Sequence, residues 1–195
     1  MQENSEIKTL IGWLAEADPV RREHAAAEVY RRGTKAALGA VREWMADAEL
    51  ARIFSLDSGG LPHMTVGIAV APGLFESIHA ANGSPRFAEV PSDQDAREFE
   101  LQFSHGACLD ILTTRDLRGH GAIARYLGKF GEGIQQVEFL VRDVDQAAKV
   151  LSARFALAPV YPAARAGADH TRVNFFLSAL PEGGKILIEL VEAKP

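Results

Sequence analysis

Two acids and two uncharged polar residues lie within otherwise apolar stretches of this sequence. Asp110 lies in LDIL and Glu189 in IELV, while Thr65 opens TVGIAV and Gln136 opens QVEFLV. Neighbouring side chains of a strand point to opposite faces, so the aliphatic residues beside each acid face away from it. An unpaired carboxylate in a half-buried cleft has a raised pKa and suits a general base near neutral pH. The alternative is that one or both acids hydrogen-bond to a neighbour such as Gln136 and only shape a pocket.

These four residues belong to a pattern that occurs twice. TVGIAV matches QVEFLV and LDIL matches IELV, and each pair opens and closes a segment of about fifty residues. A repeat of this length indicates two copies of one supersecondary unit, neither of which buries its apolar face alone. We therefore expect the two copies to bring Thr65, Asp110, Gln136 and Glu189 to one central pocket.

Each copy has the pattern of a strand, a helix and three further strands. Helices are expected over 73–81, 122–130 and 144–155, the second ended by Gly131 and the third capped by Asp143. The expected strands are 63–71, 86–90, 97–103, 107–113, 135–141, 159–161, 171–178 and 185–192. The prediction is an α+β fold in which two tandem βαβββ modules form a curved eight-stranded sheet around a cleft. The helices cover its outer face.

A helical N-terminal extension precedes this domain. Residues 1–54 are rich in Ala, Glu, Arg and Leu, and Asp18-Pro19 is typical of a helix start. Gly33 is expected to end that helix and Thr34 to cap another. ADPVRREHAAAEVYRRG resembles a HEAT-type repeat over little more than one repeat. A lone repeat must pack on something else, which favours a cap on the rest of the protein.

The predicted organisation is a helical extension over 1–54, a linker over 55–62 and a repeat domain over 63–195. The two modules of the repeat domain are placed at about 63–117 and 133–192, from the strand pattern. The linker, SLDSGGLP, contains a Gly pair and a Pro that mark irregular structure.

Composition restricts the classes of partner. Of 195 residues, 47% are hydrophobic and 24% charged, which is ordinary for a globular protein, and the net charge of −5 argues against a nucleic-acid partner. No apolar run reaches the roughly 18 residues that span a bilayer. The single cysteine, Cys108, excludes an internal disulfide and a CxxC-type zinc site. Because MQENSEIK has no signal-peptide pattern, we expect a cytoplasmic protein.

The architecture together with further motifs resembles the vicinal oxygen chelate superfamily, whose members include glyoxalase I, extradiol dioxygenases and bleomycin-binding proteins. Within it, the sequence is most similar to the methylmalonyl-CoA epimerases. The motifs are ARYLGKFGEG, GEGIQQVEFLVRDVDQAAKVL, TRVNFF and KILIELVE. The resemblance spans roughly residues 63–192 and is stronger in the second module.

The resemblance also implies a set of metal ligands. The superfamily usually chelates one divalent metal through two His and two Glu or Gln residues. By the resemblance, Asp110 and Glu189 lie at the acid positions, whereas Thr65 and Gln136 replace the two histidines. Only Glu189 is then an unweakened ligand, and an all-oxygen set would favour magnesium, manganese or calcium. His63, two residues before Thr65, is either a substitute ligand or a solvated residue where the strand begins. The presence of a divalent metal is left open.

Three functions remain in competition. The first is an isomerase or lyase of the epimerase or glyoxalase type, acting on a small α-oxo or acyl-thioester substrate. Glu189 would be the base, with Asp110 as the second candidate catalytic acid. The second is a metal-free small-molecule-binding protein, like the antibiotic-sequestering relatives. The third is an interaction protein whose helical N-terminus docks a partner. Because relatives pair modules within or across chains, a homodimer is also left open.

Overall fold

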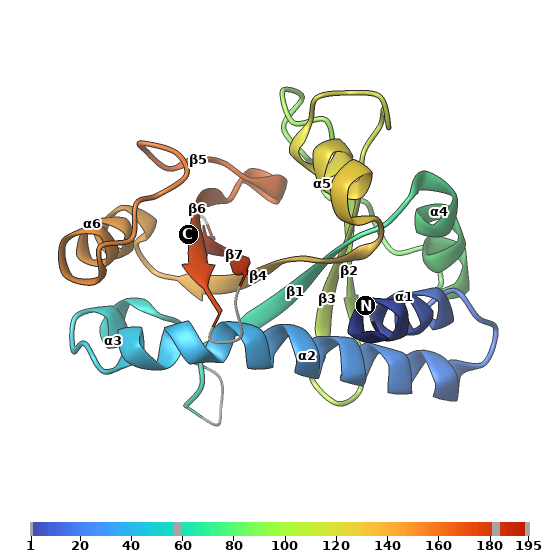
Figure 1. The fold of residues 1–195 in the computed structure, drawn as a ribbon, viewed down its shortest axis with the longest axis horizontal. Coiled ribbons are helices and arrows are strands. Elements are labelled where there is room, and N and C mark those ends of the chain that lie inside the picture. The colour runs from blue at the N-terminus through green and yellow to red at the C-terminus, as the bar shows by residue number, and fades with distance from the viewer. Residues whose placement is uncertain (1, 57–59, 181–183, 194–195) are drawn as a thin grey trace. The chain divides into compact units, whose positions relative to one another are not determined.

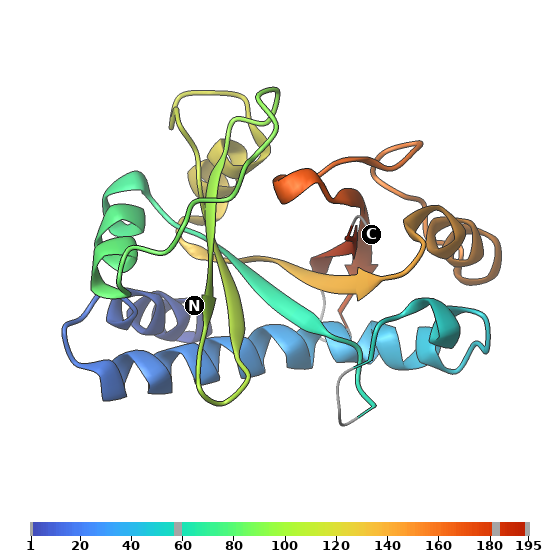
Figure 2. The same ribbon diagram turned by 180° about the vertical axis from the view of Figure 1, so that it is seen from behind.

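The computed structural model describes every residue except 1, 57–59, 181–183 and 194–195. The chain divides into two compact units, each built from two separate stretches. Unit 1 comprises Met1–Gly33 and Thr65–Gln135, and unit 2 comprises Thr34–Met64 and Gln136–Pro195. Figures 1 and 2 show the helices and strands of these units from opposite sides.

Unit 1 combines a small sheet with helices. Its strands follow the order β2-β3-β1, with β1 parallel and β2 antiparallel to β3. Helices α4 and α5 both contact β3. The elements are α1 (Gln2–Trp13), the first part of α2 (Pro19–Met45), β1 (Met64–Ala69), α4 (Pro72–Ala81), β2 (Arg97–Gln102), β3 (Cys108–Thr113) and α5 (Ala122–Phe130).

Helix α2 is continuous, so the prediction that Gly33 ends a helix and Thr34 caps the next one is wrong. Gly33 has another role. A Cβ atom built on Gly33 would lie 2.7 and 2.8 Å from the two methyl carbons of Val66, which is fully buried on β1. A glycine allows the helix backbone to approach the sheet at this point, and the packing compensates for the low helix propensity of glycine.

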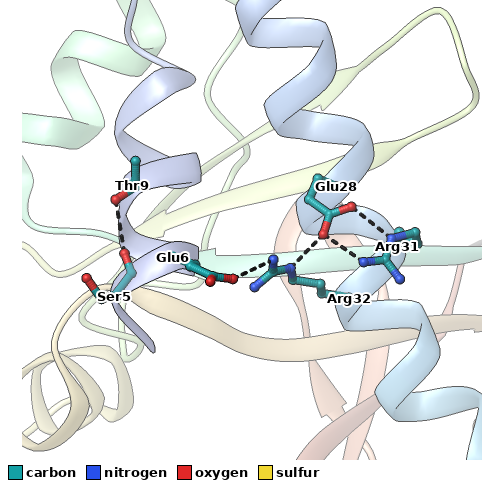
Figure 3. A network of polar contacts seen from close by, with 6 residues as sticks. All are labelled: Ser5, Glu6, Thr9, Glu28, Arg31 and Arg32. Carbon is teal, nitrogen blue, oxygen red and sulfur yellow. Dashed lines mark hydrogen bonds and ion pairs between the residues drawn. The ribbon is translucent and has the colours of Figure 1, made fainter. Parts of the chain in front are cut away.

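A chain of ion pairs joins α1 to the first half of α2 (Figure 3). Arg32 bridges Glu6 on α1, at 3.1 Å, and Glu28 on its own helix, at 2.8 Å. Arg31 holds the same Glu28 at 2.7 Å. Hydrogen bonds from Arg31 and Arg32 lower the pKa of the Glu28 carboxyl from its ordinary value to about 2. The carboxylate is therefore charged throughout the ordinary pH range.

Unit 2 contains the second half of the fold. Its strands follow the order β4-β7-β6-β5, with β4 parallel to β7 and the other pairs antiparallel. Helix α6 contacts α3, β6 and β7. As predicted, Asp143 caps α6 by accepting a hydrogen bond from the Gln146 amide at 2.8 Å. The elements are the rest of α2, α3 (Leu50–Ile53), β4 (Gly133–Val141, begun in unit 1), α6 (Val144–Phe155), β5 (Arg165–Ala166), a 3-10 turn (Ala168–His170), β6 (Arg172–Ala179) and β7 (Lys185–Glu192).

The described residues form seven strands rather than the eight expected. Residues 86–90 are not a strand, although the amide of Ala88 donates one hydrogen bond to the Glu98 carbonyl on β2. Pro85 and Pro91 flank this stretch, and proline cannot donate to a strand ladder. In unit 2, the expected strand at 159–161 is reduced to a single bridge between Pro159 and Phe176.

The proposed domain boundaries at 54 and 63 stay a prediction. The two compact units do not follow them, since each unit includes residues from both sides. Residues 57–59 of the expected linker lie outside the described part of the chain. None of the helices in the described ranges is long and apolar enough to cross a membrane.

Candidate functional site

In unit 1, Thr65 and Asp110 lie on the same face of neighbouring strands. Gly67 on β1 is the partner of Asp110 on β3, so Thr65, two residues earlier, faces Cys108. Thr65, Cys108 and Asp110 are all buried, and we call them the Thr65 cluster. Strand β2 adds Glu100, which lies directly opposite Asp110 and is exposed.

The cysteine of this cluster is a protonated thiol rather than a nucleophile. Burial raises the pKa of the Cys108 thiol to about 12, and a hydrogen bond with Thr65 opposes the rise only in part. The negative charges of Glu100 and Asp110 raise it further. Because the thiolate is the reactive form, this thiol is inert near neutral pH. Cys108 therefore acts as a small buried side chain.

The other end of this face is closed by apolar packing. Ala69 and Leu112 lie on the same face as Thr65 and Asp110 and pack against Ile123 of α5. Tyr126, also on α5, packs against these three apolar residues, and its hydroxyl donates a hydrogen bond to the Ile134 carbonyl at 2.7 Å. Burial raises the pKa of Tyr126 to about 12. Helix α5 thus covers the sheet beyond Asp110 and leaves the polar residues at the opposite end.

In unit 2, the structure brings Gln136 and Glu189 into direct contact. Gln136 and Glu138 lie two residues apart on β4 and therefore face the same way. Glu189 on β7 lies opposite Glu138 in the parallel ladder. Gln136 and Glu189 are buried and Glu138 is partly exposed. We call Gln136, Glu138 and Glu189 the Gln136 cluster.

The amide nitrogen of Gln136 joins the two acids. Its Nε2 atom donates to Oε1 of Glu138 at 2.9 Å and to Oε2 of Glu189. An amide NH2 has two hydrogens, so each acid receives one. The opposite orientation of the amide would place its oxygen against two carboxylates. The nitrogen of Gln136, and not its oxygen, is therefore turned toward Glu189.

This donor set does not fit a divalent metal. Glutamine binds a metal through its oxygen, yet the Gln136 oxygen is turned away from the two acids. Among the described residues, no group of three or more His, Cys, Asp or Glu side chains is placed to hold a metal ion. His63 is exposed, and its main chain is bonded to Ser55 and Leu140. Its role as a substitute ligand stays a prediction.

Two acids of these clusters, Glu138 and Glu100, were not predicted from the sequence. Both were detectable, because Glu138 follows Gln136 by two residues and Glu100 lies in an alternating strand, REFELQ. What the sequence does not contain is the strand register that places Glu138 opposite Glu189 and Glu100 opposite Asp110. The convergence of the Thr65 and Gln136 clusters on one pocket stays a prediction.

The sequence matches no family model and no curated protein. Among solved structures, it is similar to methylmalonyl-CoA epimerase from Mycobacterium tuberculosis. The identity is 34%, the match covers 67% of this chain and 87% of that one, and the TM-score is 0.55.

Two more distant structures share the fold. Streptomyces coelicolor methylmalonyl-CoA epimerase, in complex with 2-nitronate-propionyl-CoA, is 24% identical over 73% of this chain and 99% of that chain, with a TM-score of 0.52. A hypothetical protein from Bacillus halodurans C-125 is 18% identical over 67% of this chain and 93% of that one, with a TM-score of 0.53.

Proposed function

We propose a function from one premise: this chain belongs to the vicinal oxygen chelate superfamily, in the family of the methylmalonyl-CoA epimerases. The proposed ligand is a small acyl thioester, the class of compound bound in the Streptomyces coelicolor structure. The proposed reaction is exchange of the proton on the carbon next to the thioester carbonyl. The observation that supports it is a buried carboxylate, Glu189, held by the Gln136 amide.

In this proposal Glu189 is the general base. The C–H bond next to the carbonyl breaks, its proton moves to a Glu189 carboxylate oxygen, and the electron pair enters the carbonyl to give an enolate. Return of a proton to the same carbon restores the thioester, with its configuration retained or inverted. The hydrogen bond from Gln136 fixes the rotamer of Glu189, which keeps the carboxylate oriented before the substrate arrives. No step is assigned to a metal, because the donor set does not fit one.

A second candidate is a binding protein that performs no chemistry. The specific observation in its favour is the same donor set, since a metal that could stabilise an enolate oxygen has no fitting ligands among the described residues. In this case the Gln136 cluster would only shape the ligand pocket.

One experiment separates the two candidates. The protein is mixed with methylmalonyl-CoA or propionyl-CoA in D2O, proton NMR follows the signal at the carbon next to the carbonyl, and calorimetry measures binding. The first candidate requires faster loss of this signal, with the gain abolished in Glu189→Gln. Glu76→Gln on α4 is the matched control, because Glu76 is an exposed acid that forms an ion pair with Arg97 and belongs to neither polar cluster. Binding without exchange would support the second candidate, and absence of binding would refute both.

A further inference from the structure

The two acids of the Gln136 cluster form an unfavourable pair unless something lies between them. Glu138 and Glu189 are directly opposite each other on the parallel strands β4 and β7. Like charges at facing positions destabilise a sheet, and burial increases that cost. Proteins usually resolve such a pair with a shared proton, a bound cation or hydrogen-bond donors.

In this protein one nitrogen atom supplies a donor to both acids. The Nε2 atom of Gln136 donates one hydrogen to each acid. A divalent cation that bridged Glu138 Oε1 and Glu189 Oε2 would occupy the place of the amide nitrogen. The amide nitrogen and such a cation therefore compete for one place.

We propose that the Gln136 amide nitrogen replaces a cation between Glu138 and Glu189, so that removing the amide uncovers a divalent-cation site made by the two acids. The superfamily usually binds a divalent metal, and this donor set does not fit one. In this proposal the Gln136 amide is the cause of that difference. A neutral amide donates a hydrogen bond to each acid, while the hydrogens that it turns toward them exclude the ion. The uncovered site has only oxygen donors, which favours Mn²⁺, Mg²⁺ or Ca²⁺ over softer metals.

Mn²⁺ titration followed by electron paramagnetic resonance tests the proposal, because free Mn²⁺ gives the signal and bound Mn²⁺ loses it. Two variants are compared with the wild type. Gln136→Ala removes both the donors and the bulk, and Gln136→Glu keeps the size and adds a third carboxylate. We expect at least a tenfold lower Kd for Mn²⁺ in both variants. The added change Glu189→Gln is expected to reverse the gain.

Gln146→Ala is the matched control. Gln146 is also a partly buried glutamine of unit 2 that donates to a carboxylate, at 2.5 Å from Glu49 Oε1, but it lies on α6. We expect its Mn²⁺ affinity to equal that of the wild type. Circular dichroism verifies that each variant is folded. If Gln136→Ala does not fold, Gln136→Glu alone tests the proposal.

Two results would overturn the proposal. One is wild-type protein that binds Mn²⁺ as tightly as the folded Gln136 variants. The other is a folded Gln136→Glu protein that gains no affinity. Neither readout uses an acyl thioester, so the outcome is independent of the proposed function. The Gln136 variants can bind Mn²⁺ even if the wild type catalyses no proton exchange. Equally, the wild type can catalyse proton exchange even if the variants gain no Mn²⁺ affinity.

Discussion

Replacing Gly33 by alanine gives a sharp test of how α2 packs on β1. The new Cβ would lie 2.7 Å from Val66 Cγ1, 2.8 Å from Cγ2 and 3.4 Å from Cβ. Because both methyls are crowded, rotating Val66 relieves one contact while it tightens the other. Overpacking of this kind costs about 1–3 kcal/mol. Against this cost, replacing glycine by alanine inside a helix stabilises the helix by about 1 kcal/mol. We therefore expect Gly33→Ala to lower the free energy of unfolding by about 1 kcal/mol.

The same helix provides the control. Gly39 is exposed, and a Cβ added to it would have no atom within 4 Å, so Gly39→Ala gains helix propensity without a clash. We expect it to be more stable than the wild type by up to about 1 kcal/mol. Since the propensity gain is common to both variants, the difference between them isolates the contact with Val66.

The assay is urea unfolding at equilibrium, with equal m-values required before free energies are compared. Adding Val66→Ala to Gly33→Ala removes the crowded methyls, so the two changes together should cost less than the sum of their separate effects. The reasoning would be refuted if Gly33→Ala and Gly39→Ala stabilised the protein equally. Strictly additive effects of the Gly33 and Val66 changes would refute it as well.

Three further predictions concern Glu28, Cys108 and Gln135. Glu28→Gln should cost about 1 kcal/mol at pH 7. Because the pKa of Glu28 is lowered to about 2, that cost should shrink as pH falls from about 4.5 toward 2, and a cost independent of pH in urea melts would contradict this. Cys108, whose pKa is raised to about 12, should resist a thiol reagent at pH 8 until urea unfolds the protein; rapid labelling of native protein would disprove its burial. Gln135→Leu should stabilise the fold by about 1 kcal/mol in the same urea assay, because the buried Gln135 Oε1 atom lacks a hydrogen-bond partner in the described part of the chain. Gln146→Leu, which removes a bonded amide, should destabilise the fold instead.

The elements that the sequence predicted well are those whose limits are set by nearby residues. Helix 144–155 has its predicted bounds because Asp143 caps its first turn. Helix 122–130 ends as predicted because Gly131, with φ 72°, leaves the helical conformation. Strand 185–192 also has its predicted bounds, since a run of apolar residues, interrupted only by Glu189, lies between the polar residues Lys185 and Glu192.

The features that the sequence could not provide depend on contacts between distant residues. Gly33 has the local pattern of a helix stop, and only its closeness to Val66 shows that it lies inside a helix. Glu189 was identified as a site candidate, and a hydrogen bond to Gln136 was one of the alternatives considered. That Glu138 lies opposite Glu189 follows from strand register, which the amino-acid pattern leaves undetermined.

Because the two units are interleaved along the chain, the early helices of unit 1 are synthesised well before the rest of that unit. Residues 1–33 emerge first, but the second stretch of their unit, Thr65–Gln135, is complete only about 100 residues later. At a translation rate of roughly 5–20 residues per second, synthesis of these residues takes on the order of 5–20 seconds. During that delay Ile11, Leu14 and Val29, all fully buried in the finished fold, lack the second stretch of their unit. The nascent chain should therefore depend on chaperones that shield apolar helices until the later stretch has been made.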